Sequence, residues 1–154
     1  MNKIDLQNRS AVITGGAQGI GLAIAERLLM SGASVSLWDR DETLVKKTAN
    51  TLASKGNVEY VVMDVTNLDS VKKATNQTKD SLGSIELLIC NAGIAGPSGK
   101  IWEYPPEEWE RVISVDLTGV FNCLHAVTPL MIGQNYGRIV NIASVAGKEG
   151  NPNA

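Results

Sequence analysis

The sequence predicts a doubly wound α/β domain, in which a parallel sheet lies between two layers of helices. Short apolar runs of strand length alternate along the chain with amphipathic segments of helix length. Each apolar run ends beside a glycine or a polar residue, and ligands bind beyond the carboxyl ends of the strands in such sheets. We therefore expect one three-layer α/β/α domain over residues 1–154, with a ligand site at that edge.

Length and composition suit one domain and argue against several classes of protein. The chain has 154 residues, 44% of them hydrophobic, which is enough for one sizeable core. A net charge of −2 provides no basic face for nucleic acid or acidic lipid. Residues 1–8 are too polar for a signal peptide, and no run approaches the ~18 apolar residues of a membrane span. We therefore expect a cytoplasmic protein without a nucleic-acid or membrane partner, and we expect no metal site.

Residues 10–21, S-A-V-I-T-G-G-A-Q-G-I-G, predict a strand, a tight turn and the start of a helix. The apolar run 11–13 stops at Thr14, and the turn that follows contains Gly15, Gly16, Gly19 and Gly21. Glycine permits positive φ and lets a ligand's phosphates approach the backbone. The first turn of a helix offers unpaired N–H groups and the positive end of its dipole, so the segment suits an anion. A glycine-rich turn without a ligand is the alternative that this stretch leaves open.

The remaining elements follow from periodicity and from start and stop signals. The predicted strands cover residues 11–13, 34–38, 58–63, 85–90 and 138–142. The predicted helices start at residues 20, 41, 67 and 106 and end near residues 32, 53, 83 and 131. Asp41 and Asn67 suit N-caps, Gly83 suits a C-terminal stop, and Pro106 suits a first turn. The first helix should bury Ile20, Ile24 and Leu28. The second should bury Leu44, Val45, Thr48, Ala49 and Leu52.

Five glycine or polar residues mark the ends of the five predicted strands. They are Gly15, Asp39, Asp64, Asn91 and Ser144. Since the carboxyl ends of parallel strands lie at one edge of the sheet, these residues converge on the expected ligand site. Ordinary turn chemistry is the alternative, because Gly, Asp, Asn and Ser are all common in turns.

Asp39 predicts a preference for NAD. It lies 18 residues after Gly21, close to the ~20-residue offset at which an acid binds the adenosine ribose in dinucleotide-binding domains. Its carboxylate would accept hydrogen bonds from the ribose hydroxyls. It would also repel a 2′-phosphate, by about 4 kcal/mol for unit charges ~4 Å apart at an effective dielectric of 20. Arg40 would offset part of that repulsion, so we expect NADP to bind more weakly rather than not at all. A helix cap or an ion pair with Arg40 is the alternative role for Asp39.

The last predicted helix carries an acid on its apolar side. That side consists of Trp109, Val112, Ile113, Val120, Phe121 and Leu124. Asp116 falls among these residues, and an acid on an inward face must be paired or must line a cavity. Gly119 weakens the helix nearby and permits a bend. A solvent-facing acid at a gap in the apolar side is the alternative.

The two cysteines, Cys90 and Cys123, are expected to be reduced, buried thiols. A catalytic thiol would need a base beside it. His125, the one histidine, lies two residues from Cys123 and therefore on another side of the helix.

Four motifs, in this order, resemble the short-chain dehydrogenase/reductase family. They are Thr14-Gly15-x-x-x-Gly19-x-Gly21, Asp64, Asn91-Ala92-Gly93 and Ser144. The set is similar to that of 3-oxoacyl-acyl-carrier-protein reductases and spans nearly all of the chain. The resemblance implies a Rossmann-type sheet in the order 3-2-1-4-5, with a nicotinamide cofactor, NAD or NADP, laid across its top.

The resemblance also implies which residues bind the cofactor. With Asp39 and Arg40 they are Gly15, Gln18, Gly19, Ile20, Gly21, Asp64, Val65, Asn91, Ala92 and Gly93. Asp64 and Val65 would hold the adenine, while Asn91 and Gly93 would contact the ribose and the sheet edge.

Two residues are implied at the reacting centre. Ser144 would hydrogen-bond the oxygen of a small-molecule substrate. Asp116 stands where the family usually has an Asn that helps to hold a water in the proton path. An acid there accepts a hydrogen bond but donates none from an amide.

One family feature is absent from the sequence. The family's proton donor is a Tyr with a Lys four residues later, and none of Tyr60, Tyr104 and Tyr136 has a Lys at that distance. We therefore expect an incomplete domain, truncated before that motif. We expect it to be inactive or slow alone, because general acid catalysis contributes typically 10²–10⁴-fold.

The predicted function is that of an oxidoreductase. It would transfer a hydride between NAD(P) and a secondary alcohol or ketone, such as a 3-oxoacyl thioester or a sugar derivative. The alternative is a non-catalytic dinucleotide-binding module. We further expect the fifth strand to be an exposed sheet edge, and the helix 106–131 to face another subunit of a homo-oligomer.

Overall fold

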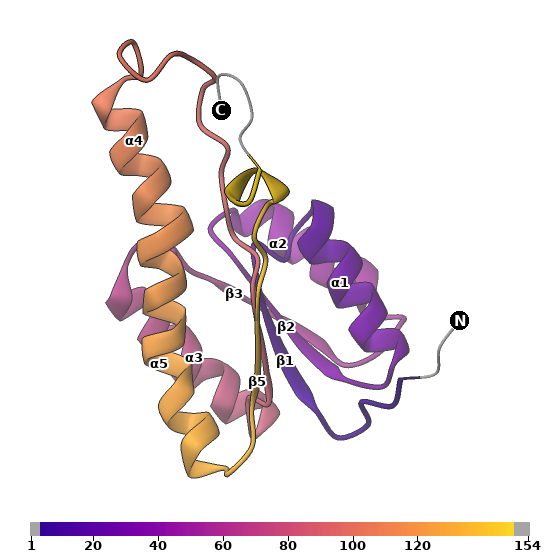
Figure 1. The fold of residues 1–154 in the computed structure, drawn as a ribbon. Helices are drawn as coiled ribbons and strands as arrows, with labels where there is room; N and C mark the ends of the chain where they lie inside the picture. The colour runs from indigo at the N-terminus through magenta and orange to yellow at the C-terminus, as the bar shows by residue number, and fades with distance from the viewer. Residues whose placement is uncertain (1–3, 150–154) are drawn as a thin grey trace.

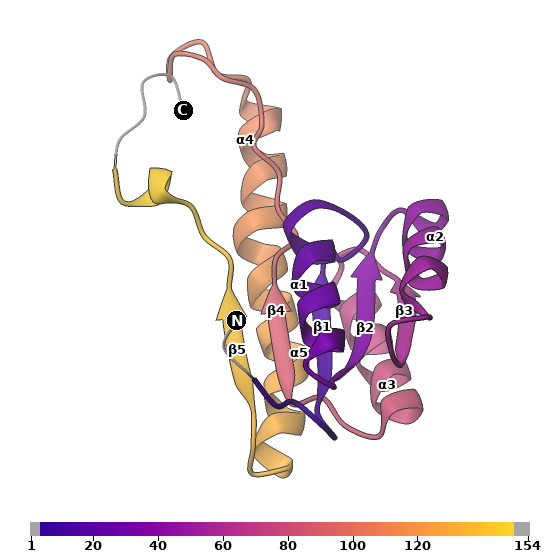
Figure 2. The same cartoon turned by 90° about the vertical axis from the view of Figure 1, so that its right-hand side faces the viewer.

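The computed structural model describes residues 4–149 and confirms the predicted five-stranded parallel sheet. The strands are β1 (Ser10–Thr14), β2 (Ser34–Asp39), β3 (Val58–Val62), β4 (Leu87–Cys90) and β5 (Arg138–Asn141). Their order is β3-β2-β1-β4-β5, as the family resemblance implies, and Figure 2 shows all five side by side. The central strand β1 pairs in parallel with both β2 and β4, so its carboxyl end lies between theirs.

Helices cover both faces of the sheet. One face carries α1 (Gly19–Met30) and α2 (Glu42–Leu52), and the other carries α3 (Leu68–Leu82) and the long helical segment that begins at Pro106 (Figure 1). Neighbouring strand residues face opposite layers, because side chains alternate along a strand. Val12 belongs to the core beneath α3, whereas Ile13 belongs to the core beneath α1 and α2. The sheet therefore separates two apolar cores, which confirms the three-layer α/β/α arrangement.

The predicted signals at the helix ends are confirmed. The Asp41 side chain accepts a hydrogen bond from the Leu44 N–H at 2.9 Å, and the Asn67 side chain accepts one from the Ser70 N–H at 2.9 Å. Gly83 ends α3 in the left-handed region, with φ of 83°. These signals depend on residues within one turn of each other, so the sequence alone reveals them.

The buried side of α1 differs from the predicted one at Ile20, whereas Ile24 and Leu28 are half-buried against the core as predicted. The helix begins at Gly19 and buries Gly21, Ala25 and Leu29, whereas the side chain of Ile20 is 63% exposed. Gly21 sits directly beneath the glycine turn, where a Cβ would collide with the Gly15 carbonyl oxygen. The close approach of α1 to the turn thus requires glycine on the inward side. It leaves Ile20 facing the ligand edge of the sheet.

The long predicted helix is divided by a π-helical turn. α4 (Pro106–Ile113) continues into this turn (Ser114–Thr118) and then into α5 (Gly119–Gly133). The Gly119 N–H donates to the Ser114 carbonyl, five residues back, and a Cβ on Gly119 would lie 2.7 Å from Cγ2 of Val65. The bend that Gly119 was expected to permit therefore takes the form of a π bulge where the helix touches the loop after β3.

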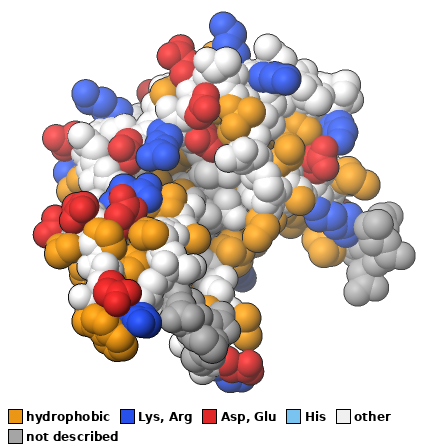
Figure 3. Space-filling view, turned by 90° about the horizontal axis from the view of Figure 1, so that it is seen from above, with side chains coloured by type: hydrophobic (Ala, Val, Ile, Leu, Met, Phe, Trp, Pro, Cys, Tyr) orange, Lys and Arg blue, Asp and Glu red, His pale blue; other side chains and the backbone are white. Residues whose placement is uncertain are grey.

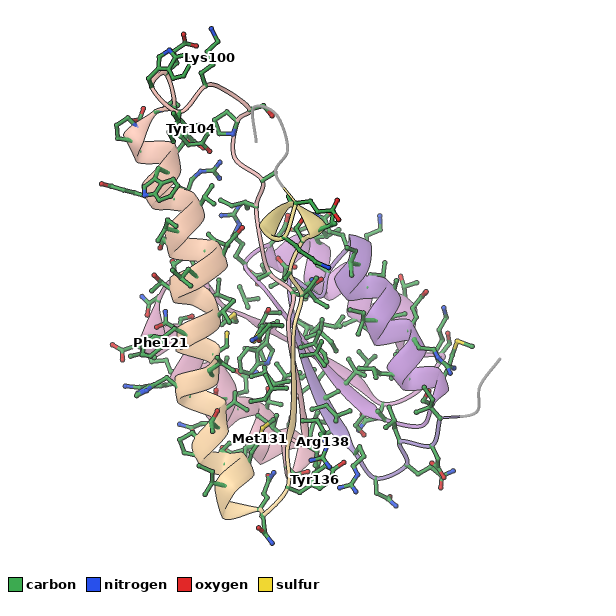
Figure 4. The ribbon with its side chains drawn as sticks, viewed as in Figure 1. Lys100, Tyr104, Phe121, Met131, Tyr136 and Arg138 are labelled. Carbon is green, nitrogen blue, oxygen red and sulfur yellow. The ribbon has the colours of Figure 1, made fainter. Side chains whose placement is uncertain are left out.

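The bulge changes which residues α5 buries. The inward side of α5 consists of Gly119, Asn122, Cys123, Val127 and Met131. Trp109 and Phe121, which were predicted to be inward, are 56% and 58% exposed. Figure 4 shows Phe121 on the outer side of the helix and Met131 on the side toward β5. The extra residue in the bulge shifts the helical repeat, so one continuous 3.6-residue pattern could not describe both halves.

Among residues 4–149, the continuous segment Pro106–Gly133 is the one helix long and apolar enough to cross a membrane, with mean hydropathy 1.3 in its most apolar 18-residue window. Core helices meet the same criterion of length and composition. The buried residues of this segment, Cys123, Val127 and Met131, form part of the core against the sheet.

The strand β5 lies at the outer edge of the described sheet, as predicted. All four of its residues are exposed, and it pairs only with β4 among the described strands. Ile139 and Val140 expose 40% and 47% of their surface. This edge is therefore an apolar surface on the described part of the chain.

Candidate functional site

The carboxyl ends of β1, β2 and β4 and the loop after β3 enclose one cavity of about 360 Å³. Figure 3 shows the molecule from above, the side to which the strands point. Of the twelve residues predicted to bind a cofactor, ten line this cavity. They are Gly15, Gln18, Ile20, Asp39, Arg40, Asp64, Val65, Asn91, Ala92 and Gly93. Four of the five predicted strand-end residues, all except Ser144, therefore converge at the edge where the topology places a ligand.

The glycine turn leaves backbone donors at the mouth of the cavity. Gly19 has φ of +56°, and a Cβ built on it would meet nothing within 4 Å. The N–H groups of Gly19, Ile20 and Gly21 lie in the first turn of α1, where the helix supplies no acceptor. Open space beside these donors, at the positive end of the helix dipole, is the chemistry that an anionic phosphate requires.

The side chain of Thr14 joins the glycine turn to β4. Its hydroxyl oxygen accepts hydrogen bonds from the backbone N–H groups of Asn91 and Ala92 at 2.9 and 3.0 Å. The same hydroxyl donates to the Ile89 carbonyl at 3.4 Å. Thr14 is 1% exposed, so these bonds fix the ends of β1 and β4 relative to each other in the dry interior.

The side chain of Asn91, which follows β4, holds the backbone of the glycine turn. Its side-chain amide nitrogen donates to the carbonyl oxygens of Thr14 and Gly15 at 3.0 and 3.2 Å. This amide group therefore holds the backbone of the turn. The predicted contact between Asn91 and a ribose stays a prediction.

Asp39 holds the tip of the glycine turn against the end of β2. Its Oδ2 accepts from the Ala17 N–H at 3.1 Å, and its Oδ1 accepts from the Asp41 N–H at 3.2 Å. Each carboxylate oxygen has two acceptor sites, so one on each remains available at the cavity. The alternative of an ion pair between Asp39 and Arg40 is not formed in the described part of the chain.

The wall beside β3 is built from Asp64 and Val65. The Asp64 carboxylate accepts from the N–H and the hydroxyl of Thr66, at 2.9 and 2.8 Å, which fixes the loop. The Val65 carbonyl accepts from the side-chain amide of Asn122, a buried residue of α5, at 2.9 Å. The wall is thus tied to the helix on the far layer.

Asp116 is paired, although it does not line the cavity. It lies in the π-helical turn, and its Oδ1 accepts from the Ile94 N–H at 2.9 Å. A Cβ on Gly93 would lie 3.5 Å from that oxygen, so the carboxylate borders the segment after β4. The residue itself is exposed, in contrast to the predicted inward position, because the bulge takes it off the apolar side.

Ser144 stands apart from the cavity in the described structure. It follows β5 and caps a short 3₁₀ helix (Val145–Gly147), with its hydroxyl oxygen accepting from the Ala146 N–H at 3.2 Å. It is exposed and is not among the lining residues. Its predicted contact with a substrate is therefore untested by this arrangement.

The sequence of the chain settles its family. A family model described as short chain dehydrogenase matches residues 9–154. The chain belongs to the short-chain dehydrogenase family. Within it, the chain is 43% identical over 146 residues to a 2-dehydro-3-deoxy-L-rhamnonate dehydrogenase (NAD(+)) of Sphingomonas sp.. It is 34% identical over 151 residues to a 3-oxoacyl-acyl-carrier-protein reductase of Staphylococcus epidermidis.

Solved structures of the short-chain dehydrogenase family share the fold. NAD+-bound xylitol dehydrogenase superposes with a TM-score of 0.94 at 36% identity, covering 96% of this chain and 57% of that one. A family member from Burkholderia phymatum in complex with NAD gives a TM-score of 0.91 at 36% identity, covering 99% and 54%. The alignments with the Sphingomonas and Staphylococcus proteins cover 95% and 94% of this chain. It spans only 57% and 60% of their lengths.

The tyrosines of this short-chain dehydrogenase lie away from the cavity. Tyr104 lies just before the start of α4, and Tyr136 lies just before β5, at the end of the sheet away from the cavity (Figure 4). Tyr136 lies between the guanidinium groups of Arg9 and Arg138, 3.9 and 4.7 Å from its ring centre. Tyr60 packs against the core beneath α1 and α2. None of the three lines the cavity, so none takes the place of the family's proton donor there.

The cysteines are both free and buried, as predicted. Cys90 ends β4, and Cys123 lies on the buried side of α5 in the same core. Interaction with the Cys90 thiol and burial raise the pKa of Cys123. A thiol that resists ionisation is a poor nucleophile, which argues against a catalytic role for Cys123. Both cysteines are buried in the core beneath α3 and α5. Among residues 4–149, no group of three or more His, Cys, Asp or Glu side chains is arranged to hold a metal ion.

Four lining residues were not predicted from the sequence. They are Trp38, Met63, Ile94 and Val115. Trp38 and Met63 immediately precede Asp39 and Asp64, so their position beside strand-end residues was a usable signal. Val115 belongs to the π-helical turn, which no local pattern indicated.

Proposed function

We propose that the protein is an NAD-dependent oxidoreductase that transfers a hydride between the nicotinamide and a secondary alcohol or ketone. One observation carries the proposal. Residues from the ends of β1, β2 and β4 and the loop after β3, chosen from sequence as cofactor ligands, line a single cavity. The family of the chain and the NAD named in its relatives support the same cofactor.

The residues of the cavity fit a dinucleotide. The first-turn N–H groups of α1 suit its diphosphate, and the Asp39 carboxylate suits the adjoining ribose hydroxyls. Asp64 and Val65 would border the adenine. Asn91, Ala92 and Gly93 would border the ribose and the sheet edge. Asp39 disfavours a 2′-phosphate by charge repulsion, so NAD is the preferred cofactor, while Arg40 allows NADP to bind more weakly.

The chemistry of hydride transfer assigns roles to two further residues. The bound nicotinamide supplies the hydride donor or acceptor. Ser144 can donate its hydroxyl proton in a hydrogen bond to the substrate oxygen, because its oxygen already accepts from Ala146. Asp116 acts on the segment after β4 by holding the Ile94 N–H. Substrates of the sugar-acid or 3-oxoacyl class are proposed from the names of the relatives.

The protein acts in the cytoplasm as a homo-oligomer. Two buried, free thiols suit a reducing compartment. The outer side of the π-helical turn and α5 exposes Leu117, Phe121 and Ile132, which would pack against a second copy.

Calorimetric titration with NAD and with NADP tests the proposal. The intact protein should bind NAD more tightly, and Asp39→Ala should narrow the ratio of the two affinities by about 10-fold, or 1.4 kcal/mol. The ratio is the decisive quantity, because loss of the Ala17 bond weakens both cofactors alike. Asp41→Asn is the matched control, since it removes a neighbouring charge and keeps a capping oxygen.

Three results would each contradict all or part of the proposal. Failure of the intact protein to bind either dinucleotide would remove it altogether. An affinity ratio that Asp39→Ala leaves unchanged would remove the role of Asp39. Binding without hydride transfer to or from secondary alcohols and ketones would instead indicate the non-catalytic module.

A further inference from the structure

The tip of the glycine turn is held from both sides at Ala17. The Ala17 N–H donates to Asp39, as described above. The Ala17 carbonyl accepts from the hydroxyl of Thr48 at 2.8 Å. Thr48 lies on α2, on the side that otherwise buries Val45, Ala49 and Leu52, and it is 8% exposed. A buried hydroxyl on an apolar helix side thus binds the backbone of the turn.

The bond to Thr48 fixes the direction of the next backbone donor. The peptide group between Ala17 and Gln18 is planar and trans, so its C=O and N–H point in opposite directions. With the carbonyl held toward α2, the Gln18 N–H must point away from α2. Gln18 lines the cavity and is the N-cap of α1.

The two backbone N–H groups immediately before Gln18 already form hydrogen bonds within the chain. The Gly16 N–H donates to the Trp38 carbonyl at 3.3 Å, and the Ala17 N–H donates to Asp39 at 3.1 Å. The Gln18 N–H is therefore the first in the turn after those bound to the end of β2. Gln18 is also the N-cap of α1, so the orientation of its N–H group affects how the backbone enters the first turn of that helix. The N–H groups of Gly19, Ile20 and Gly21 lie in that turn.

We propose that Thr48 is a positioning residue for the dinucleotide site. Its hydroxyl holds the Ala17–Gln18 peptide in the orientation that presents the N–H groups of the turn to a diphosphate, without touching the ligand. The inference rests on the proposed function, because it concerns the affinity of the same cavity for NAD. It assigns a role in that site to a side chain on α2, which contributes no lining residue to the cavity.

Thr48→Val tests the role with little change of shape. The substitution leaves the buried Ala17 carbonyl without its donor, and the peptide becomes free to rotate. Affinity for NAD and for ADP-ribose should each fall about 10-fold. Thr48→Ser, which keeps the hydroxyl, should stay within about 2-fold of the unmodified protein.

Thr51→Val is the matched control. Thr51 lies on the same helix, but its hydroxyl is exposed and donates to the Lys47 carbonyl of that helix at 3.0 Å. This variant removes a hydroxyl from α2 without touching the turn. It should bind NAD and ADP-ribose as the unmodified protein does.

A ligand-free measurement separates positioning from loss of stability. In ¹⁵N-labelled protein without NAD, Thr48→Val should shift the amide resonances of Ala17 and Gln18 and speed their hydrogen exchange. Thr51→Val should do neither. If Thr48→Val does not fold, Thr48→Cys, with a similar size and a weaker donor, is compared with the same controls.

The outcomes distinguish this inference from the proposed function. If the unmodified protein binds NAD and Thr48→Val binds it equally well, the role of Thr48 is wrong and the proposed function stands. The role is also wrong if Thr48→Val lowers only the melting temperature, with unchanged affinity and unchanged Ala17 and Gln18 resonances. If the unmodified protein binds no NAD, the proposed function fails, and the inference fails with it.

Discussion

Asp39 has a structural role and a proposed functional role in the same carboxylate. Asp39 follows the apolar run 34–38 and lies 18 residues after Gly21. These two features of the sequence were sufficient to predict it as a candidate ribose-binding acid at the end of β2. Its bonds to Ala17 and Asp41 depend on how the turn folds back across the sheet. No pattern in the sequence shows which residue of the turn will face the carboxylate. The sequence therefore identified Asp39 as a candidate, but it could not predict the hydrogen bonds that Asp39 forms.

The same limit applies to Asn91 and Thr14. Both belong to motifs that the sequence analysis selected, yet the bonds between them join residues 77 apart in the chain. A family motif indicates that these residue types are required. The structure adds that Asn91 serves the shape of the turn.

Gly21→Ala should destabilise the protein. The new Cβ would collide with the Gly15 carbonyl oxygen and approach the Asn91 amide nitrogen to 2.7 Å, so α1 must move away from the turn. We expect a loss of about 1–3 kcal/mol in the free energy of unfolding in urea.

Gly133→Ala is the control for Gly21→Ala. A Cβ there meets nothing within 4 Å, and the helical site should gain about 0.5–1 kcal/mol from reduced backbone freedom. Equal stability of the two variants would contradict the packing argument for Gly21.

At the scale of elements, local signals predicted helix ends well and helix faces less well. The caps at Asp41 and Asn67 act within one turn and were predicted correctly. The π-helical turn was not predicted, because no local pattern marks it and Gly119 beside it approaches Val65, from a different part of the chain. The prediction that α1 buries Ile20 was wrong for a related reason. The turn above it requires Gly21, and not the larger Ile20, to face inward.

The π-helical turn can be tested through Asp116. Asp116→Asn retains an oxygen that accepts from the Ile94 N–H, so the free energy of unfolding should change by less than about 0.5 kcal/mol. Asp116→Ala removes the acceptor and should lower it by about 0.5–1.5 kcal/mol. Hydrogen exchange at the Ile94 amide should quicken in the Ala variant alone. Equal exchange in both variants would show that the carboxylate does not hold this segment.

At the scale of the whole molecule, alternation of apolar runs and amphipathic segments was enough to predict the architecture. The strand order β3-β2-β1-β4-β5 was implied by the family resemblance, and the structure confirms it. Alternation predicts a parallel sheet with both faces covered, because parallel strands need crossover helices. Which side of the long helix is exposed depends on how the helix packs in the folded molecule. Hydrophobic spacing alone therefore wrongly placed Trp109 and Phe121 in the interior.

The buried thiols should report global unfolding. Cys90 and Cys123 are 2% and 1% exposed, and the raised pKa of Cys123 keeps it protonated. Both should react with a disulfide reagent such as Ellman's reagent only as fast as the domain opens, and at once in denaturant. Rapid reaction of either thiol in the folded protein would show that the core around α5 opens locally.

The outer side of α5 should govern assembly. Phe121 is 58% exposed and stacks on His125, with ring centres 5.6 Å apart. Phe121→Glu should shift the intact protein toward monomers in sedimentation velocity, since burying an unpaired charge opposes association. Ile4→Glu, at an exposed apolar site outside the helix, should leave sedimentation unchanged. Identical sedimentation of the two variants would place the interface elsewhere.

The bonds from Thr14 and Asn91 to the glycine turn have a consequence for the thermodynamics of binding. They hold the two central strand ends and the turn in one shape through bonds within the chain itself. A ligand arriving there would find its receptor already ordered, and little conformational entropy would be lost on association. Binding should therefore be rapid and rigid-body in character, with a heat-capacity change that reflects only the apolar area the ligand covers.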